Sequence, residues 1–344
     1  MQKILVTGGA GYIGSHTVVE LQNAGFDDVI VVDNLSNSSA DVLDGIMRTT
    51  NIRLNFEQLD CLDYEGLDKV FTKYKDIGAI IHFAASKAVG ESVQKPLLYY
   101  RNNLLSLINL LDLMPKHGVE NIVFSSSCTV YGQPSVLPVT EQAPRQPAES
   151  PYGNTKQICE DIVNDTVRSG AKIKGILLRY FNPIGAHLDN EIGELPLGVP
   201  QNLIPFVTQT AAGIRPKLSI FGNDYNTPDG SCIRDYINVV DLAKAHVIAT
   251  KRMLAGKSKS AVETFNLGTG KGVSVLEVVQ TFEKVTGVKL NYEVVGRRAG
   301  DIEQIWADPA YANTELGWKA EETLENTLLS AWRWQQKLMR ASAK

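Results

Sequence analysis

Cysteine is scarce in this sequence and follows no pattern. The chain of 344 residues contains 4 cysteines, Cys61, Cys128, Cys159 and Cys232, and no two of them have the C-x-x-C spacing of a zinc or redox motif. The sequence therefore favours neither a metal site nor a disulfide framework, and we expect no metal ligands. Unpaired thiols are typical of a reducing compartment, so we expect a cytoplasmic protein.

A strong excess of charge and a long apolar run are also absent. Lysine and arginine total 34 against 38 aspartates and glutamates, which gives a net charge of −4 and no basic field for nucleic acid or an anionic membrane. No apolar stretch approaches membrane-spanning length, and the N-terminus enters a strand without a basic and apolar leader. We therefore expect neither a nucleic acid nor a membrane as partner.

The start of the sequence contains an apolar segment, predicted to be a strand, that ends at a series of regularly spaced glycines. Lys3-Ile4-Leu5-Val6 runs into Thr7-Gly8-Gly9-Ala10-Gly11-Tyr12-Ile13-Gly14. Gly8 can adopt the positive φ of a tight turn, Gly11 has no Cβ to keep a pyrophosphate away, and Gly14 lets a helix sit close to the strand. The pattern predicts a dinucleotide site in which the anion rests on the helix N-terminus.

The next predicted strand, Val29-Ile30-Val31-Val32, supports this interpretation because it ends in a carboxylate. Asp33 follows the last glycine by about 20 residues, the position at which an acidic side chain accepts the ribose hydroxyls of a dinucleotide. A 2′-phosphate would be repelled there, so we expect NAD rather than NADP.

Strand and helix patterns alternate along the first half of the chain. Strands are predicted near residues 3–6, 29–32, 53–57, 79–83, 121–125 and 174–180. Such alternation predicts an α/β protein with a Rossmann-type, doubly wound parallel sheet. The last third is more irregular, and we expect a smaller, partly interleaved C-terminal α/β substrate lobe.

The expected division is a cofactor domain over residues 1–181 and a substrate domain over residues 182–344. The segment near 239–268 looks like one more helix and strand of the main sheet, so the division is approximate.

The predicted catalytic pair is Tyr152 and Lys156. Ser150-Pro151 supplies a helix cap and a first-turn proline, so the two side chains lie one turn apart on one helix face. Tyrosine ionises near pH 10, and we expect the Lys156 ammonium and the positive helix end to favour the phenolate. Lys156 can also hold the nicotinamide ribose.

A third hydroxyl is predicted at the end of the strand Ile122-Val123-Phe124. Strand ends at that edge of the sheet face the cofactor crevice, and Ser127 is the last of three serines there. We expect Ser127 to share a proton with the substrate oxygen and Tyr152, whereas Ser125 and Ser126 are plausible as caps of a turn. His16, His82 and Cys128 receive no role.

Several long stretches resemble a known family. The Thr7–Gly14 loop, Ser125–Ser127 and the Tyr152–Lys156 motif are similar to the extended short-chain dehydrogenase/reductase family. Phe83–Gln94, Arg179–His187 and Ile220–Tyr225 resemble, within that family, the UDP-glucose 4-epimerases. The resemblance covers nearly the whole chain.

The resemblance implies a set of NAD contacts. They are Gly8, Gly11, Tyr12, Ile13, Gly14, Asp33, Asn34, Asn37, Ser38, Asp60, Cys61, Phe83, Ala84, Lys87, Asn102, Tyr152, Lys156 and Tyr180. Cys61 and Ala85-Ser86 depart locally from the family pattern.

The resemblance also implies contacts with a UDP-sugar. They are Ser127, Asn182, Asn202, Leu203, Phe221, Arg234, Tyr236, Arg298, Asp301 and Ile305. Arginine forks suit a diphosphate that a lysine would hold only as a point charge.

The implied reaction interconverts UDP-galactose and UDP-glucose. Tyr152 takes the C4 hydroxyl proton while hydride passes to tightly bound NAD, the 4-keto sugar turns about the diphosphate, and hydride returns to its opposite face. Ile305 lies between the bulky and the small residues found at this family position, and we expect weak or absent use of N-acetylated sugars. The family usually forms homodimers through helices at about 91–115 and 153–168.

Two other classes of protein fit these residues less well. A nucleotide-sugar 4,6-dehydratase would need an acidic pair after the serine strand, where this chain has Cys128-Thr129. A NAD-binding regulatory module would usually lack the Tyr152–Lys156 pair. Both rank below the epimerase.

Overall fold

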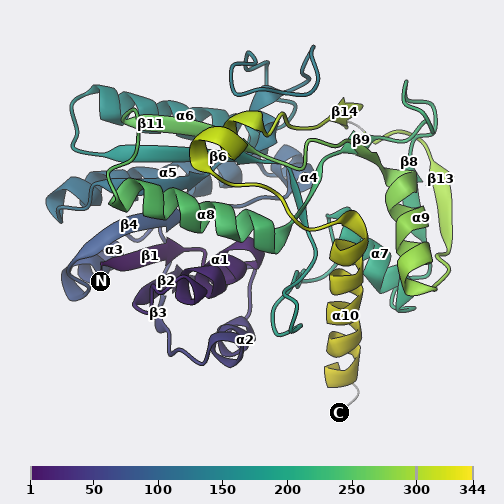
Figure 1. Cartoon of the computed structure of the whole chain (residues 1–344), viewed down its shortest axis with the longest axis horizontal. Coiled ribbons are helices and arrows are strands. Elements are labelled where there is room, and N and C mark those ends of the chain that lie inside the picture. Colours follow the sequence, from purple (N-terminus) through teal and green to yellow (C-terminus); the bar gives the residue numbers. More distant parts are fainter. Residues whose placement is uncertain (1, 299–300, 343–344) are drawn as a thin grey trace.

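A seven-stranded parallel sheet forms the centre of the protein, whose computed structural model describes residues 2–298 and 301–342. Its strands are β1 (Lys3–Thr7), β2 (Val29–Asp33), β3 (Asn55–Gln58), β4 (Ile77–His82), β5 (Asn121–Ser125), β6 (Lys174–Tyr180) and β11 (Val262–Leu267). They lie in the order β11-β6-β5-β4-β1-β2-β3 (Figure 1). Central strands such as β2 and β4 are buried along their whole length, which explains their unbroken apolar sequence.

Helices cover both faces of this sheet. On one face lie α1 (Tyr12–Asn23), α2 (Asp41–Thr50) and α8 (Val239–Leu254), and on the other α3 (Tyr64–Lys73), α5 (Pro96–Lys116) and α6 (Pro151–Arg168) (Figure 1). Two separate apolar cores result, one on each side of the sheet. The short helix α4 (Val89–Gln94) precedes α5.

The strand order reverses between β1 and β4. The chain winds outward from β1 to β3 on one side and from β4 to β6 on the other, with Thr7 of β1 paired with His82 of β4. In open parallel sheets, a ligand binds at the carboxyl ends of the strands beside this reversal. The fold therefore places the ligand crevice at the loops after β1, β4 and β5.

The residues after β6 build smaller sheets. Two-stranded sheets are formed by β7 (Asn182–Ile184) with β10 (Tyr236–Asn238) and by β8 (Leu218–Phe221) with β13 (Tyr292–Val295), and a three-stranded one by β12 (Val273–Ser274), β9 (Ile233–Arg234) and β14 (Gln304–Ile305). The helices of this part are α7 (Leu203–Ala211), α9 (Val275–Thr286) and α10 (Leu324–Ser342), and short turns of helix occur at η1 (Cys128–Tyr131) and η2 (Ala312–Leu316). α7, α9 and α10 share a third apolar core (Figure 1).

The predicted fold class is confirmed, including the interleaving. β11 pairs in parallel with β6 at the edge of the main sheet, and α8 packs against α1, so the segment 239–268 returns to the cofactor half. The domain division at residue 181 stays a prediction. In the described ranges 2–298 and 301–342, the search for a helix long and apolar enough to cross a membrane finds none.

Candidate active site

The loop between β1 and α1 is shaped for close approach. Gly8 has a φ of +72°, and a Cβ there would lie 2.7 Å from the backbone nitrogen of Ala84. A Cβ on Gly14 would overlap the carbonyl oxygen of Gly8. Gly11 is the N-cap residue of α1. Because glycine has no side chain, no cap hydrogen bond forms, and the N–H groups of the first helical turn stay available to a ligand. These residues fit the pyrophosphate of a dinucleotide.

The Asp33 carboxylate lies beside this loop at the end of β2. Its oxygens accept hydrogen bonds from the backbone N–H of Ala10 at 3.0 Å, the backbone N–H of Leu35 at 2.9 Å and the Ser38 hydroxyl at 3.0 Å. Asn34 donates from its side chain to Asp60 at 3.0 Å. The predicted ribose-binding residues are therefore gathered at the carboxyl ends of β2 and β3, with Asp33 held in place by the glycine loop itself.

Tyr152 and Lys156 lie on the buried face of α6. Ser150 accepts a hydrogen bond from the backbone N–H of Gly153 at 3.2 Å and thus caps the helix as the sequence indicates. The Lys156 Nζ lies 5.9 Å from the centre of the Tyr152 ring and donates to the carbonyl oxygen of Ser125 at 2.7 Å. The helix and the end of β5 are joined directly by this bond.

Ser127 completes the group from the other side. It follows β5, accepts a hydrogen bond from the backbone N–H of Thr129 at 3.2 Å, and lies close enough to Tyr152 to lower the pKa of that phenol. The structure thus brings together the three predicted catalytic side chains. Tyr180 lies beside them, because its hydroxyl is hydrogen-bonded to Ser125 at 2.6 Å.

The electrostatics of the pair differ from the expectation that the Lys156 ammonium and the positive helix end favour the phenolate. Burial raises the pKa of Tyr152 above its ordinary value, and the nearby Ser127 hydroxyl opposes this shift. Burial also lowers the pKa of Lys156 to about 8. The phenolate of Tyr152 and the ammonium of Lys156 are both disfavoured because both side chains are buried away from water. Without a cofactor, Tyr152 is therefore a neutral phenol.

The remaining predicted cofactor residues line the loops after β4 and the start of α5. The backbone N–H of Phe83 donates to the carbonyl oxygen of Thr7 at 3.0 Å, and Asn102 donates from its side chain to the Ser86 hydroxyl at 2.9 Å. Lys87 forms an ion pair with Glu194 at 3.8 Å. Cys61 is buried, which raises the pKa of its thiol to about 12 and makes it inert at neutral pH.

The predicted nucleotide-sugar residues form a second group, built from the short strands of the C-terminal part. Arg298 forms a two-bond ion pair with Asp301, at 2.6 and 3.2 Å, and its guanidinium lies 5.5 Å from the centre of the Phe221 ring. Arg234 approaches the same Asp301 carboxylate at 3.9 Å. Two arginines thus share a single carboxylate, and one of them, Arg298, also lies over an aromatic ring.

Short strands connect this group to the part of the crevice that lies near Ser127. Tyr236 of β10 is paired with Asn182 of β7, and Ile305 of β14 is paired with Arg234 of β9. Ile305 is 2% exposed and belongs to an apolar cluster with Cys128 and Phe181, so it lies next to the segment that follows Ser127.

Asn202 and Leu203 begin α7, and one residue that the sequence did not single out connects them to the cofactor group. Asn202 donates from its side chain to Glu194 at 2.6 Å, and Glu194 is also the partner of Lys87. Burial raises the pKa of Glu194, while Lys87 and Asn202 lower it. A glutamate in an irregular Gly/Pro-rich segment carries no local signal that could have identified it.

The histidines given no role have structural partners. His82 is hydrogen-bonded to the Thr7 hydroxyl at 2.7 Å, and His16 to the carbonyl oxygen of Tyr12 at 2.7 Å. Burial lowers the pKa of each to about 3, so both are neutral. Within the described part of the chain, the search for a cluster of three or more metal-ligating side chains finds none.

A parallel sheet with a glycine-rich first turn, and a Tyr-x-x-x-Lys pair beside a serine at the strand-order reversal, define an extended short-chain dehydrogenase/reductase. Residues 5–330 match the sequence profile of the family described as GDP-mannose 4,6 dehydratase. The chain is 52% identical to UDP-glucose 4-epimerase from Bacillus subtilis, over 96% of both chains.

Solved structures agree with this relationship. UDP-glucose 4-epimerase from Bifidobacterium longum, in complex with NAD+ and UDP, superposes with a TM-score of 0.93 at 46% identity, over 97% of this chain and 98% of that one. The enzyme from Stenotrophomonas maltophila, with NAD and formylated UDP-arabinopyranose, has a TM-score of 0.95 at 45% identity, over 99% of this chain and 100% of that one. The chain belongs to the UDP-glucose 4-epimerase family of the extended short-chain dehydrogenases/reductases.

Proposed function

We propose that the protein is a UDP-glucose 4-epimerase, an isomerase that interconverts UDP-galactose and UDP-glucose with tightly bound NAD. The observation that carries the proposal is the side-chain trio of Tyr152, Lys156 and Ser127 at the carboxyl end of β5, next to a cradle shaped for a dinucleotide. NAD, when bound, accepts a hydride from C4 of the sugar and returns it to the opposite face of the 4-keto sugar, which inverts that carbon.

The residues of the chain supply the binding and the proton transfer. Gly8, Gly11 and the N-terminus of α1 receive the pyrophosphate, and Asp33 receives the ribose hydroxyls. Tyr152 accepts the proton of the C4 hydroxyl, and its charged form is favoured by the nearby positive charges of Lys156 and the nicotinamide ring. Ser127 holds the proton between Tyr152 and the sugar oxygen.

The UDP end is assigned to the second group of residues. Arg234 and Arg298 fit the diphosphate, because a guanidinium fork can make two hydrogen bonds to phosphate oxygens. Phe221 offers a flat face for the base, and Asn182, Asn202, Leu203, Tyr236 and Asp301 complete the group. These assignments follow the family pattern, and the geometry supports them in part, because Tyr236 is paired with Asn182 and Arg234 approaches Asp301 at 3.9 Å.

Dehydration is the weaker alternative, although the matching family profile is described as a dehydratase. Elimination of water needs an acid and a base placed after Ser127. Cys128 occupies that place, and burial raises its pKa to about 12, so its thiol carries no proton to or from a substrate at neutral pH.

We also propose a substrate range and an oligomeric state. UDP-glucose and UDP-galactose are the main substrates, and Ile305 supports this because its buried side chain, in a cluster with Cys128 and Phe181, fills space that a smaller residue would leave open to an N-acetyl group. The protein acts in the cytoplasm, in keeping with four free and buried thiols.

A homodimer forms through α5 and α6. The outer surface of α4 and α5 supports this, because Val93, Leu97, Leu98, Leu105 and Ile108 are all exposed there.

The test uses purified protein and UDP-galactose with no added NAD. We expect UDP-glucose to appear, as separated by anion exchange, and a Tyr152→Phe variant to retain its NAD while kcat falls by about 10² to 10⁴. Loss of water from the sugar nucleotide would indicate a dehydratase instead. A Tyr152→Phe variant as active as the parent would contradict the proposed chemistry, and equal turnover of the N-acetylated pair would contradict the substrate range.

A further inference from the structure

A buried ion pair joins helix α6 to strand β6, next to the serines that follow β5. Glu160, 1% exposed, and Arg179, 8% exposed, are joined by two hydrogen bonds, from Nε at 2.9 Å and from a terminal nitrogen at 2.6 Å. Glu160 stands one turn after Lys156 on the same face of α6, and Arg179 lies on the neighbouring strand β6. Neither residue was among the predicted cofactor or sugar contacts, although Glu160 acts electrostatically on Lys156.

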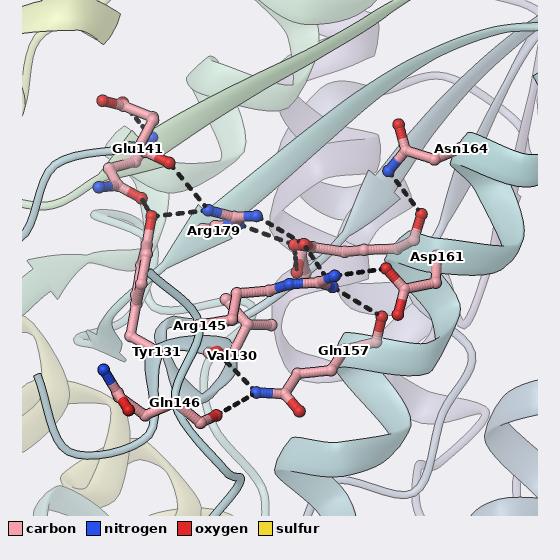
Figure 2. Close-up of polar contacts among 12 residues, drawn as sticks. Val130, Tyr131, Glu141, Arg145, Gln146, Gln157, Asp161, Asn164 and Arg179 are labelled. Carbon is pink, nitrogen blue, oxygen red and sulfur yellow. Dashed lines mark hydrogen bonds and ion pairs between the residues drawn. The ribbon is translucent and has the colours of Figure 1, made fainter. Parts of the chain in front are cut away.

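The pair reaches the catalytic segment at two points. The Ser126 hydroxyl donates to Glu160 at 2.6 Å, which holds the residue immediately before Ser127. Arg179 donates to the Tyr131 hydroxyl at 2.9 Å and to the carbonyl oxygen of Glu141 at 3.4 Å, as Figure 2 shows. The segment that contains Ser127 is therefore held by hydrogen bonds at Ser126, before it, and at Tyr131, after it.

The hydrogen bonds continue from Tyr131 to the edge strand β11 of the main sheet. The Tyr131 hydroxyl donates to the Asn266 side chain at 2.6 Å, and the Asn266 backbone N–H donates to the Glu141 carboxylate at 2.7 Å. Asn266 lies on β11, so the edge strand of the main sheet takes part in the same network. In a buried network whose polar groups are all paired, any other arrangement of the strands and helices would leave some of these groups without partners. The network therefore favours a single arrangement of those elements.

We propose that the Glu160–Arg179 ion pair is a positioning device, which fixes the end of β5 against helix α6 and so sets Ser127 at the correct distance from Tyr152. The inference rests on the proposed function, because it assigns a purpose to the pair within that reaction. A buried ion pair is weak support for stability, since apolar residues of similar size often replace one without loss. Precise placement of reacting groups is worth far more, because a misplacement of about 1 Å can cost about 10²-fold in rate.

Glu160 also has an electrostatic consequence for Lys156. The groups that face the Lys156 ammonium are Tyr152, Cys159 and Glu160 on its own helix and His82 on β4. Burial raises the pKa of Cys159 to about 12 and lowers that of His82 to about 3, so both are neutral near pH 7. Glu160 raises the pKa of Lys156 against the effect of burial, so its loss shifts the deprotonation of Lys156 to lower pH.

The experiment compares three variants with the parent, each purified with its NAD. Ser126→Ala removes the contact between the pair and β5 and leaves Glu160 bonded to Arg179. Glu160→Met combined with Arg179→Met removes the pair without leaving an unpaired buried charge. Asp161→Asn is the matched control, because Asp161 is the next residue of α6 and pairs at 2.5 Å with Arg145, whose approach to Glu160 is longer, at 3.9 Å (Figure 2).

We expect Ser126→Ala and the double variant to lose about tenfold or more in kcat, with the KM for UDP-galactose within about twofold of the parent and the NAD content unchanged. We also expect the alkaline limb of kcat to move to lower pH in the double variant alone. Asp161→Asn should match the parent in every measurement.

Parent-like kcat in Ser126→Ala would overturn the inference, and this variant decides the question even if the double variant does not fold. A loss of kcat in Asp161→Asn equal to that in Ser126→Ala would overturn it as well. An inactive parent would instead contradict the proposed function, so the two failures are distinguishable.

Discussion

Lys156 gives a prediction in which stability and activity change in opposite directions. Its ammonium is buried, and its pKa is lowered from 10.5 to about 8. Keeping the charged form in the folded protein at pH 7 therefore costs about 3 kcal/mol, since each unit of pKa corresponds to about 1.4 kcal/mol. Lys156→Met removes the charge and keeps the length of the side chain.

The net gain is smaller than this cost, because methionine cannot make the hydrogen bond to the Ser125 carbonyl oxygen. That bond contributes about 1 kcal/mol. We therefore expect Lys156→Met to be about 2 kcal/mol more stable than the parent at pH 7 and to have lost nearly all epimerase activity. An active-site residue that costs stability is common where function needs a buried charge.

The assay is urea unfolding at equal, saturating NAD, with the contribution of NAD binding subtracted from separately measured affinities. The pH dependence checks the cause. Between about pH 8 and 10.5 the unfolded Lys156 holds a proton that the folded one has lost, so the parent gains stability as pH rises and the advantage of the variant shrinks. Lys172→Met is the control, because Lys172 is exposed, and its effect should stay within about 0.5 kcal/mol. A Lys156→Met variant less stable than the parent, or an advantage that does not change with pH, would refute the reasoning.

Three further predictions concern the cofactor, the diphosphate and the proposed dimer. Asp33→Asn should weaken NAD binding about tenfold and reduce discrimination against NADP, because the charge that repels a 2′-phosphate is gone; unchanged affinities in fluorescence titrations would contradict this. Arg298→Ala should raise the KM for UDP-galactose about tenfold with little change in kcat, and a large loss of kcat alone would argue against a role in binding. Leu97→Glu together with Ile108→Glu should give a monomer in light scattering, because like charges would then meet in the proposed interface and could not pair; a dimer as stable as the parent would argue against this interface.

The sequence predicted the main sheet well, because each of its strands is long enough to carry a pattern. A fully buried strand such as β2 is a continuous apolar run, and its boundaries in the structure differ from the predicted ones by a single residue. The Tyr152–Lys156 pair was equally accessible, because Ser150 and Pro151 fix where α6 begins and hence which face the two side chains share.

The C-terminal part could not be predicted in the same way. β9 and β14 have two residues each, too few for any periodicity, and the pairing of Arg234 with Ile305 joins segments about 70 residues apart. Glu160 did leave a local signal, since it continues the spacing of Tyr152 and Lys156 along one helix face. Its partner Arg179 comes from another element, however, and only the folded structure places the two side chains together.

The proposed reaction also requires that the nucleotide be held firmly and the hexose loosely, and the described residues divide in this way. The charged groups, Arg234, Arg298 and Asp301, lie together at the nucleotide end. At the sugar end, the cluster around Ile305 and Cys128 is apolar. The cluster offers a turning 4-keto sugar no charged side chain to separate from, whereas each hydrogen bond to a charged group that the sugar lost would cost about 1.5 to 3 kcal/mol. The diphosphate can therefore stay anchored while the sugar presents its opposite face, which is the motion that distinguishes an epimerase from a simple dehydrogenase.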